Sequence, residues 1–406
     1  MQENLKQKKY RVAIITPTPF HYHTPLYKRI EGGSQIDLTV YYCSDETLTG
    51  IDIERMYHIK DKMIDSEDLL QGHNYKFLKN YSPYPSYMRW PIGLINFSIW
   101  KEIKNNKYDV VIIQAWNNFT WWLIAVACIV FKTPYMFMTD ANELGRYSKM
   151  GFKKTFKKFL LGNCLFKRAR GFLTSGIANE EFYNYYGVSY KKMKRMPFSW
   201  GYDEILELAK KIKNQRTEDR KHLGIDEEDI VFLYVGRLSR EKLPLTLIDA
   251  YDKVNNKNKK LFLVGAGPMS EEIKKYVIDK KIKGVRFLGF QKRPHLFNFY
   301  NVADALILPS EIEPWGIVVN EAMCFGLPII ASDRVGAAVD LVKDNYNGFI
   351  FPAGNVKNLA ICIKSISDMT SEEKALFGER SLNIITDWVE KNNPAQRMLK
   401  VLELLK

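Results

Sequence analysis

The sequence lacks the residue clusters that mark disulfide-rich or metal-binding proteins. Its five cysteines are dispersed without a C-x-x-C pair, and its six histidines are scattered apart from His21 and His23. A dispersed, odd set of cysteines is typical of reduced thiols in a cytoplasm. There is also no D-x-D element and no cluster of acids and histidines. We therefore expect neither a metal nor a cofactor.

Long hydrophobic runs are also missing. The longest, WWLIAVACIVF at residues 121–131, is too short to span a bilayer and predicts a buried helix instead. The stretch MQENLKQKKYR at the N-terminus is polar and basic, without the apolar core of a signal peptide. These absences favour a cytoplasmic protein.

Acidic residues are scarce in the first half of the chain. Residues 1–200 carry 29 Lys and Arg against 17 Asp and Glu, whereas residues 201–406 carry 31 against 29. Residues 146–170 hold nine cations and no acid, and KKMKR follows at 191–195. Such an excess predicts an anionic partner: a membrane surface, a lipid phosphate or a nucleic acid. No nucleic-acid-binding module is visible, so we expect no nucleic acid.

The basic stretch 146–170 has two interpretations. Apolar and basic residues lie on neighbouring faces at helical spacing, namely Phe152, Phe156, Phe159 and Leu160 beside Lys153, Lys154, Lys157 and Lys158. This pattern is typical of a helix lying on an anionic membrane. The alternative is a solvated basic face above phenylalanines in the core. We favour the first interpretation, which places the protein peripherally at the inner face of the plasma membrane.

Short apolar strands alternate with helices in both halves. The 406 residues, 46% of them apolar, exceed one ordinary core and predict two domains. The expected strands include 38–43, 107–116, 134–140 and 171–175 in the first half, and 230–239, 260–268, 304–310 and 328–332 in the second. Strand, helix and strand at this spacing predict α/β domains with parallel sheets. The junction is expected near residues 197–205.

The stretch EPWGIVVNE places Glu313 and Glu321 around the start of a helix predicted over 317–325. Because a strand ends just before it, the stretch lies where ligands bind in open α/β sheets. Free helix amides attract a phosphate there, while the two carboxylates suit sugar hydroxyls. A nucleotide sugar carries both groups. Taken alone, the same residues fit a loop acid, a turn glycine and an exposed helix residue.

The stretch GRLSREK at 236–242 follows another strand of the second half. Arg237 and Lys242 come after a turn at Gly236, so both would project from the same sheet edge as Glu313. A guanidinium and an ammonium beside a helix N-terminus form a diphosphate clamp. The alternative is that both are ordinary surface charges. The glutamate segment on the same edge favours the clamp.

Residues 230–355 resemble the nucleotide-sugar domain of retaining glycosyltransferases of family four (group 1), which have the GT-B fold. The shared features, in the family's order, are VGRLSREK, LVGAGP, VRFLGF, ADALILPSEIEPWGIVVNEAMCFGLPIIASDRVGAAVDLV and NGFIFPAGN. The first half is similar more loosely, mainly in its strand order and in NCLFKRARGFLTSG. The resemblance implies two Rossmann-like domains facing across a cleft. They are an acceptor domain at 1–200 and a nucleotide-sugar domain at 201–385, with a C-terminal helix at 386–406 that packs on the first domain.

The resemblance also implies donor contacts, residue by residue. Arg237 and Lys242 would hold the donor diphosphate. Glu313 would contact the hydroxyls of the transferred sugar, and Glu321 those of the ribose. The remaining contacts would come from the main chain: amides of Trp315, Gly316 and Ile317 at sugar and phosphate, Phe290 at the base, and the Gly265 and Gly267 turn at the nucleotide. A tight strand–helix turn explains these two glycines equally well.

The reaction implied by the resemblance retains the anomeric configuration. The acceptor would attack from the face that the diphosphate leaves, and the leaving phosphate oxygen can accept the acceptor's proton. No residue is placed as a covalent nucleophile. The donor would be a UDP- or GDP-sugar, and the acceptor a saccharide or lipid-linked hydroxyl in cell-surface glycan synthesis.

In this family the first domain binds the acceptor. The loop TPFHYHTPLY at 17–26 lacks the glycine pair common in relatives, so His21 or His23 could reach the acceptor; both also fit ordinary loop residues. Where relatives often have a histidine, TDANELGRYSK carries Asp140, with Glu143 nearby on the acceptor side. Asp140 fits either a base for the acceptor hydroxyl or a helix cap.

Two other functions fit parts of the pattern. A GT-B nucleotide-sugar epimerase or hydrolase would need a general base in the cleft and no acceptor. A catalytically dead scaffold on a membrane or a nucleic acid would need no sugar site, yet Arg237, Lys242, Glu313 and Glu321 are all present. We therefore expect a metal-independent, retaining hexosyltransferase.

Overall fold

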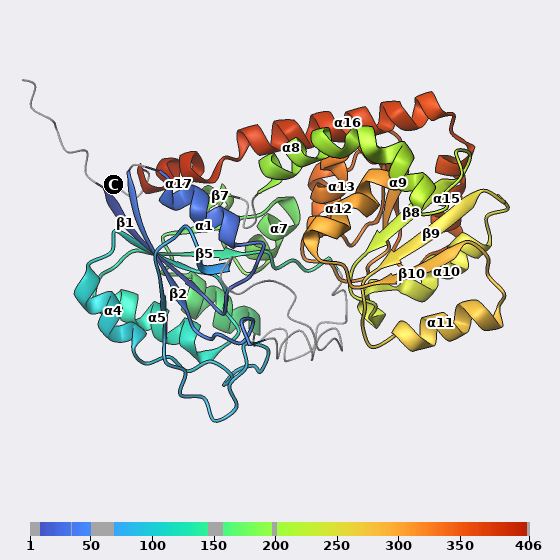
Figure 1. Cartoon of the computed structure of the whole chain (residues 1–406). Helices are drawn as coiled ribbons and strands as arrows, with labels where there is room; N and C mark the ends of the chain where they lie inside the picture. Colours follow the sequence, from blue (N-terminus) through green and yellow to red (C-terminus); the bar gives the residue numbers. More distant parts are fainter. Residues whose placement is uncertain (1–8, 34, 50–68, 145–156, 197–200, 404–406) are drawn as a thin grey trace, which may run out of the picture.

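The computed structural model describes residues 9–33, 35–49, 69–144, 157–196 and 201–403. Within them, two parallel sheets form two neighbouring units, each with helices on both faces (Figure 1). The predicted pair of Rossmann-like α/β domains is thereby confirmed.

The first sheet has seven parallel strands in the order β3-β2-β1-β4-β5-β6-β7. They are β1 (Tyr10–Thr16), β2 (Ile36–Tyr42), β3 (Tyr75–Phe77), β4 (Val110–Ile113), β5 (Tyr135–Thr139), β6 (Gly171–Thr174) and β7 (Met193–Arg195). Its helices are α1 (Thr24–Glu31), α4 (Ile99–Asn106), α5 (Phe119–Val130), a π-helix (Leu160–Phe166) and α7 (Ile177–Tyr185).

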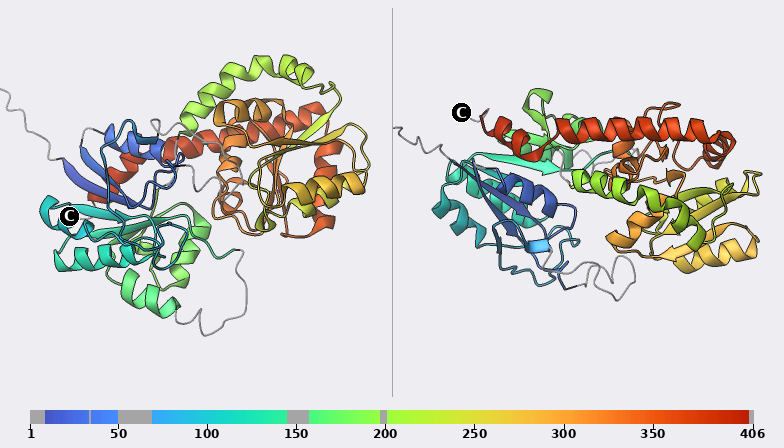
Figure 2. Two further views of the ribbon diagram at one scale, coloured as in Figure 1. Left: turned by 60° about the horizontal axis from the view of Figure 1, so that its bottom comes forward. Right: turned by 45° about the horizontal axis from the view of Figure 1, so that its top comes forward.

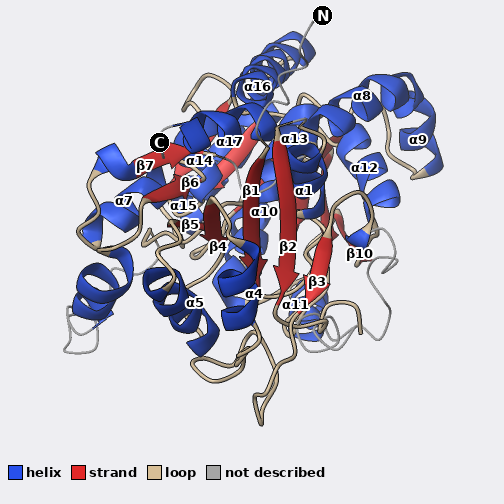
Figure 3. Ribbon diagram, turned by 90° about the vertical axis from the view of Figure 1, so that its left-hand side faces the viewer, coloured by secondary structure: helices blue, strands red, loops and turns tan. Residues whose placement is uncertain are grey.

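Both faces of this sheet are covered, which explains its continuous apolar strands. Alternate residues of β1 enter different cores: Val12 and Ile14 pack with α1, and Ala13 and Ile15 pack with α4 and α5. Figure 3 shows α4 and α5 beside these strands. The helix predicted over 121–131 is α5, but only one of its faces is buried, because the helix covers the sheet from outside and leaves Val126 and Val130 exposed.

The second sheet has six parallel strands in the order β10-β9-β8-β11-β12-β13. They are β8 (Ile230–Val235), β9 (Lys259–Val264), β10 (Val285–Gly289), β11 (Ala305–Leu308), β12 (Ile329–Ser332) and β13 (Gly348–Phe351). Its helices are α8 (Tyr202–Ile212), α9 (Arg216–His222), α10 (Pro244–Asp252), α11 (Ser270–Asp279), α12 (Arg293–Val302), α13 (Ile317–Cys324), α14 (Gly336–Leu341) and α15 (Val356–Asp368).

Two C-terminal helices lead back to the first domain. The long α16 (Ser371–Lys391) runs along the second domain, and α17 (Pro394–Glu403) contacts α1 of the first (Figures 1 and 2). The expected boundary between 385 and 386 falls inside α16. The domain boundaries themselves stay a prediction.

The basic stretch of the first domain is described only in part. Phe152, Phe156 and the lysines at 153 and 154 lie outside the described residues. Lys157 lies over the ring of Trp116 at 4.4 Å, next to the carboxyl end of β4, whereas 191–192 precede the amino end of β7. The C-terminal part of the stretch 146–170 reaches that same end of the sheet, because Lys192 donates hydrogen bonds to the carbonyls of Lys167 at 3.5 Å and Ala169 at 3.1 Å. Among the described residues, no helix is long and apolar enough to cross a bilayer.

Candidate active site

The two segments singled out in the second half meet at the carboxyl ends of β8 and β11. Lys242 Nζ lies 2.6 Å from Glu313 Oε2 and donates a hydrogen bond of 3.2 Å to the carbonyl of Ile312. Ser310 Oγ approaches the same carboxylate oxygen at 3.3 Å. Both side chains of the ion pair are largely buried. An ammonium and a carboxylate are thus held together beside the start of α13.

Arg237 lies on the same loop and forms an ion pair with Glu241, which was not predicted from the sequence as a site residue. Its guanidinium pairs with Glu241 and donates a 3.2 Å hydrogen bond to Ser239. Burial raises the pKa of Glu241, but hydrogen bonds from Ser239 and Arg237 outweigh it and hold the pKa at about 2. The spacing of four residues between Arg237 and Glu241 is the feature of the sequence that could have indicated this ion pair.

The start of α13 depends on a glycine. Gly316 caps the helix with φ of +93°, and a Cβ there would lie 3.1 Å from Leu308 and Val335 side chains. The Trp315 side chain turns inward, with 4% exposure and its Nε1 bonded to Asn320 Oδ1 at 3.0 Å. What the turn can offer a ligand is therefore main chain, since the first amides of a helix have no intrahelical acceptor. Gly316 and Ile317 occupy that position.

Glu321 lies one turn into α13 and is 3% exposed. It accepts hydrogen bonds from Arg293 at 2.8 Å and from the Tyr300 hydroxyl at 2.9 Å. Arg293, at the start of α12, was not singled out from the sequence, because its link to Glu321 forms only through the fold. The contact of Glu321 with a ribose stays a prediction.

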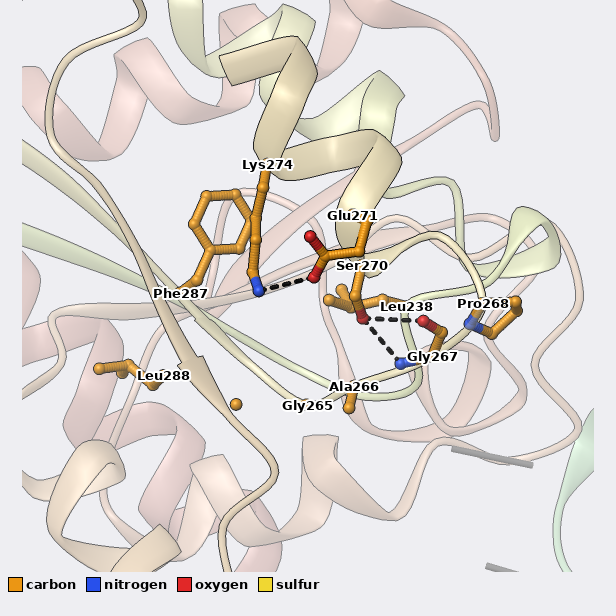
Figure 4. A pocket seen from close by; sticks show the side chains of 11 residues that line it. Leu238, Gly265, Ala266, Gly267, Pro268, Ser270, Glu271, Lys274, Phe287 and Leu288 are labelled. Carbon is orange, nitrogen blue, oxygen red and sulfur yellow. Dashed lines mark hydrogen bonds and ion pairs between the residues drawn. The ribbon is translucent and has the colours of Figure 1, made fainter. Parts of the chain in front are cut away.

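A pocket lies beside this site, at the loops that follow β8, β9 and β10. It has a volume of about 670 Å³, and its wall includes Gly265, Gly267, Ser270, Lys274 and Gly289 (Figure 4). Figure 4 shows Lys274 and Glu271 paired along α11, with Phe287 across from them. Phe290 directly follows Gly289 in the chain, and its contact with a base stays a prediction.

Gly265 and Gly267 form the tight turn that one interpretation of the sequence expects, and their approach to a nucleotide stays a prediction. A Cβ on Gly265 would lie 1.9 Å from the carbonyl oxygen of Gly236, and one on Gly267 2.4 Å from that of Leu238. The turn therefore requires glycine for close packing of the β8 and β9 loops. The same two residues also line the pocket.

Asp140 of the first domain faces this site. It directly follows β5; burial raises its pKa to about 6, and the negative charge of Glu313 contributes to the rise. The neighbouring Asn142 donates hydrogen bonds to the carbonyls of Glu313 at 3.1 Å and Pro314 at 2.8 Å. The structure thus brings Asp140 and Glu313 together from different domains. Asn142 was missed because nothing near it in the sequence indicates a partner 171 residues away.

The remaining acceptor-side candidates are His21, His23 and Glu143. Burial and the positive charge of Arg293 lower the pKa of His21 to about 3, so His21 is neutral near the second domain. His23 is buried against aromatic rings, with Tyr22 at 4.6 Å, and burial lowers its pKa to about 3. Glu143 accepts a 3.1 Å hydrogen bond from Tyr186 and lies 3.8 Å from Lys157. Across the described ranges, no group of three His, Cys, Asp or Glu residues is placed as metal ligands would be.

Known proteins are similar in sequence to the second half of the chain and similar in fold to the whole chain. Residues 215–381 match the family model described as glycosyl transferases group 1. This part of the chain is therefore similar to the group 1 glycosyl transferases. The matched residues include the Arg237–Lys242 loop, the pocket and the Glu313–Glu321 segment, so the resemblance stated from the sequence is confirmed.

Two curated relatives show how far the similarity in sequence extends. An uncharacterized glycosyltransferase from Methanocaldococcus jannaschii is 28% identical over 257 residues, covering 61% of this chain and 63% of the relative. The lipopolysaccharide 1,2-N-acetylglucosaminetransferase of Salmonella typhimurium is 28% identical over 196 residues, covering 46% and 51%. The match therefore spans less than two thirds of either relative.

A solved structure extends the likeness to the whole fold. HepE of Anabaena, solved in complex with UDP and glucose, superposes with a TM-score of 0.69 at 17% identity, covering 97% of this chain and 99% of that one. At this identity the comparison concerns the fold alone. The predicted GT-B fold is confirmed.

Proposed function

We propose that the chain transfers a hexose from a UDP- or GDP-sugar to a hydroxyl of a saccharide or lipid-linked acceptor in cell-surface glycan synthesis. Three findings support this proposal. The group 1 model covers the second sheet, the similar fold of HepE was solved with UDP and glucose, and a Salmonella relative is named for transfer to lipopolysaccharide.

One observation carries the proposal: the Lys242–Glu313 ion pair lies beside the start of α13 and opposite Asp140. A diphosphate entering beside Lys242 would meet the ammonium and the free amides of the helix start. Glu313 would then be released to accept hydrogen bonds from sugar hydroxyls. The 670 Å³ pocket beside Gly265 would take the nucleoside.

The proposed reaction proceeds with retention and without a metal. The acceptor oxygen forms a bond to the anomeric carbon as the bond from that carbon to the diphosphate oxygen breaks, both on one face of the sugar. The hydroxyl proton passes to the leaving phosphate oxygen, or to Asp140. Arg237 and Lys242 stabilise the charge that develops on the diphosphate.

The direct test begins with thermal-shift binding of nucleoside diphosphates and nucleotide sugars, followed by turnover with the donor that binds best. Lys242→Ala and Arg237→Ala are each expected to lower turnover by about 10²–10³ while keeping the wild-type circular dichroism spectrum. The exposed Arg240 on the same loop is the matched control, and Arg240→Ala is expected to keep its activity. Near wild-type transfer by either clamp variant would refute the clamp.

The anomeric configuration of the product, read by NMR, tests retention. An inverted product would contradict it. If the protein isomerises or hydrolyses the donor as fast without an acceptor as with one, it is the alternative epimerase or hydrolase instead.

We also propose that the protein associates peripherally with the inner face of the plasma membrane through the basic stretch 146–170. The cations of this stretch support it, and those of 191–195 add to them, because Lys192 lies against the carbonyls of Lys167 and Ala169. Sedimentation with anionic liposomes should show binding at low salt that weakens as salt is raised. Absence of binding at low salt would contradict the proposal.

A further inference from the structure

The loop between β3 and α4 exposes an unusual number of large apolar side chains. Among the described residues twenty such side chains are exposed, and six of them lie between 78 and 98, which we call the aromatic loop. Their exposed fractions run from 45% to 66%, for Tyr81, Tyr84, Met88, Trp90, Ile92 and Phe97. A concentration of this kind on a folded domain marks a surface that meets a partner.

The aromatic loop is held in place by its polar groups. Asn80 donates to the carbonyl of Gly93 at 2.9 Å, and its Oδ1 accepts the amide of Ile95 at 2.9 Å. Asn96 donates to the carbonyl of Cys43 at 2.9 Å, and Asn118 to that of Tyr87 at 3.1 Å. Since the polar side chains point inward to the domain, the outward position of the apolar ones is fixed by the fold.

The apolar surface continues along the neighbouring helix. Phe97 and Phe119 place their ring centroids 6.3 Å apart, and Phe119 begins α5. From there, exposed Val126 and Val130 recur on the same helical face. Figure 1 shows the loop descending below α4 and α5 at the edge of the first domain.

The charged residues of the segment 69–101 are all basic. Residues 69–101 contain no Asp or Glu. Lys79 lies 5.0 Å from the ring of Tyr81 and Arg89 5.7 Å from that of Tyr84, so cations flank the exposed rings. Aromatic side chains at headgroup depth beside Lys and Arg are the composition of a membrane interface.

The aromatic loop also joins the acceptor side to the basic stretch. The Tyr87 ring lies 5.5 Å from that of Phe20, in the loop expected to meet the acceptor, and the Tyr87 amide donates to Glu46 at 3.0 Å. On its other side, Asn118 follows closely after Trp116, whose ring lies under Lys157. A bilayer on this surface would bring a lipid-linked acceptor next to the acceptor loop.

We propose that the aromatic loop inserts into the headgroup region of an anionic bilayer. The inference rests on the proposed peripheral association and deepens it, by assigning insertion to residues 78–98 and electrostatic attraction to the flanking cations Lys79 and Arg89. A glycan partner fits less well, because Met88, Ile92 and Phe97 have no polar group to bond a sugar, and the apolar surface extends along α5.

The test compares two triple variants of the full chain with wild type by sedimentation with vesicles of phosphatidylglycerol and phosphatidylcholine. The loop variant carries Tyr84→Ser, Trp90→Ser and Phe97→Ser. Its partition coefficient is expected to fall about tenfold or more, since three apolar side chains lose their burial. The control carries Ile278→Ser, Ile361→Ser and Leu376→Ser, three exposed apolar positions of the second domain, and is expected to bind as wild type does.

The proposal is overturned if wild type and the loop variant bind vesicles equally, or if the control loses as much binding as the loop variant. A second readout separates this proposal from the proposed function: UDP binding and transfer to a water-soluble acceptor should be unchanged in the loop variant. Failure of wild type to bind any nucleotide would defeat the proposed function while leaving the vesicle result standing. Unchanged vesicle binding with weakened affinity for a soluble oligosaccharide would replace the bilayer with a glycan.

Discussion

At the scale of single residues, the charged side chains proposed to bind the donor are already paired. Lys242 contacts Glu313, Arg237 contacts Glu241, and Glu321 contacts Arg293. A bound diphosphate would replace a carboxylate as the partner of a cation, and the displaced acid would be available to sugar hydroxyls. The pairs keep the charges compensated while no donor is bound.

Asp140 should make the proposed transferase activity depend on pH. Because burial raises its pKa to about 6, its carboxylate is protonated below that pH and ionised above it. If Asp140 accepts the acceptor's proton, kcat/KM should fall about tenfold for each pH unit below about 6. Asp140→Asn should abolish this acid limb and lower the plateau. Glu143→Gln should keep the limb, and an unchanged acid limb in Asp140→Asn would exclude Asp140 as the base.

Arg293 is expected to stabilise the fold through Glu321. Without the guanidinium, a carboxylate that is 3% exposed keeps Tyr300 as its hydrogen-bond partner but loses its counter-charge. We expect Arg293→Leu to lower the free energy of unfolding by about 1–3 kcal/mol, measured by urea denaturation. The adjacent exposed Lys292 serves as the control through Lys292→Ala. Equal stability of the two variants would show that the pair contributes nothing.

At the scale of the elements, the positions of the site loops follow from local sequence. The strand expected over 304–310 is β11 at Ala305–Leu308, and the helix expected over 317–325 is α13 at Ile317–Cys324. These elements were predictable because apolar runs bounded by glycine and proline fix both type and ends. Asn142 and Arg293 were not predictable, because their partners come from other elements of the fold. The inward turn of Trp315 depends on Asn320 and could not be read from the motif.

The turn between β9 and α11 is expected to tolerate no side chain at Gly265. Its φ is +140°, and an added Cβ would lie 1.9 Å from the carbonyl oxygen of Gly236. Gly265→Ala should therefore lower the melting temperature and weaken binding of the preferred nucleoside diphosphate, because the two pocket loops must separate. Gly354 is the matched control, with φ of +76° and no atom within 4 Å of a Cβ. A Gly265→Ala protein no less stable than Gly354→Ala would contradict the role of close packing.

At the scale of the whole molecule, the two domains are joined by contacts far apart in the sequence. Arg195 of β7 pairs with Asp340 of α14 at 3.2 Å, and Asp340 also accepts the amide of Ile177 at 2.9 Å. With the hydrogen bonds of Asn142, these contacts hold Asp140 and Glu313 on facing sides of the site. Their residues lie in separate halves of the chain, which is why sequence patterns could indicate two domains but not this arrangement.

The C-terminal helix is expected to contribute to the stability of the first domain. Met398 of α17 is fully buried in a core shared with Leu26 and Ile30 of α1. Met398→Ala should lower the free energy of unfolding by about 2–5 kcal/mol. The exposed Lys400 provides a control through Lys400→Ala, measured in the same urea titration. A loss below about 1 kcal/mol would indicate that α17 is only loosely attached.

The central claim is that Lys242, Arg237 and the start of α13 bind the diphosphate of a nucleotide sugar. Calorimetric titration with UDP, GDP and the matching nucleosides tests it most directly. The preferred diphosphate should bind at least about a hundredfold more tightly than its nucleoside. Lys242→Ala should remove most of this difference, whereas Arg240→Ala should preserve it. Equal affinity for diphosphate and nucleoside in the wild-type protein would contradict the account.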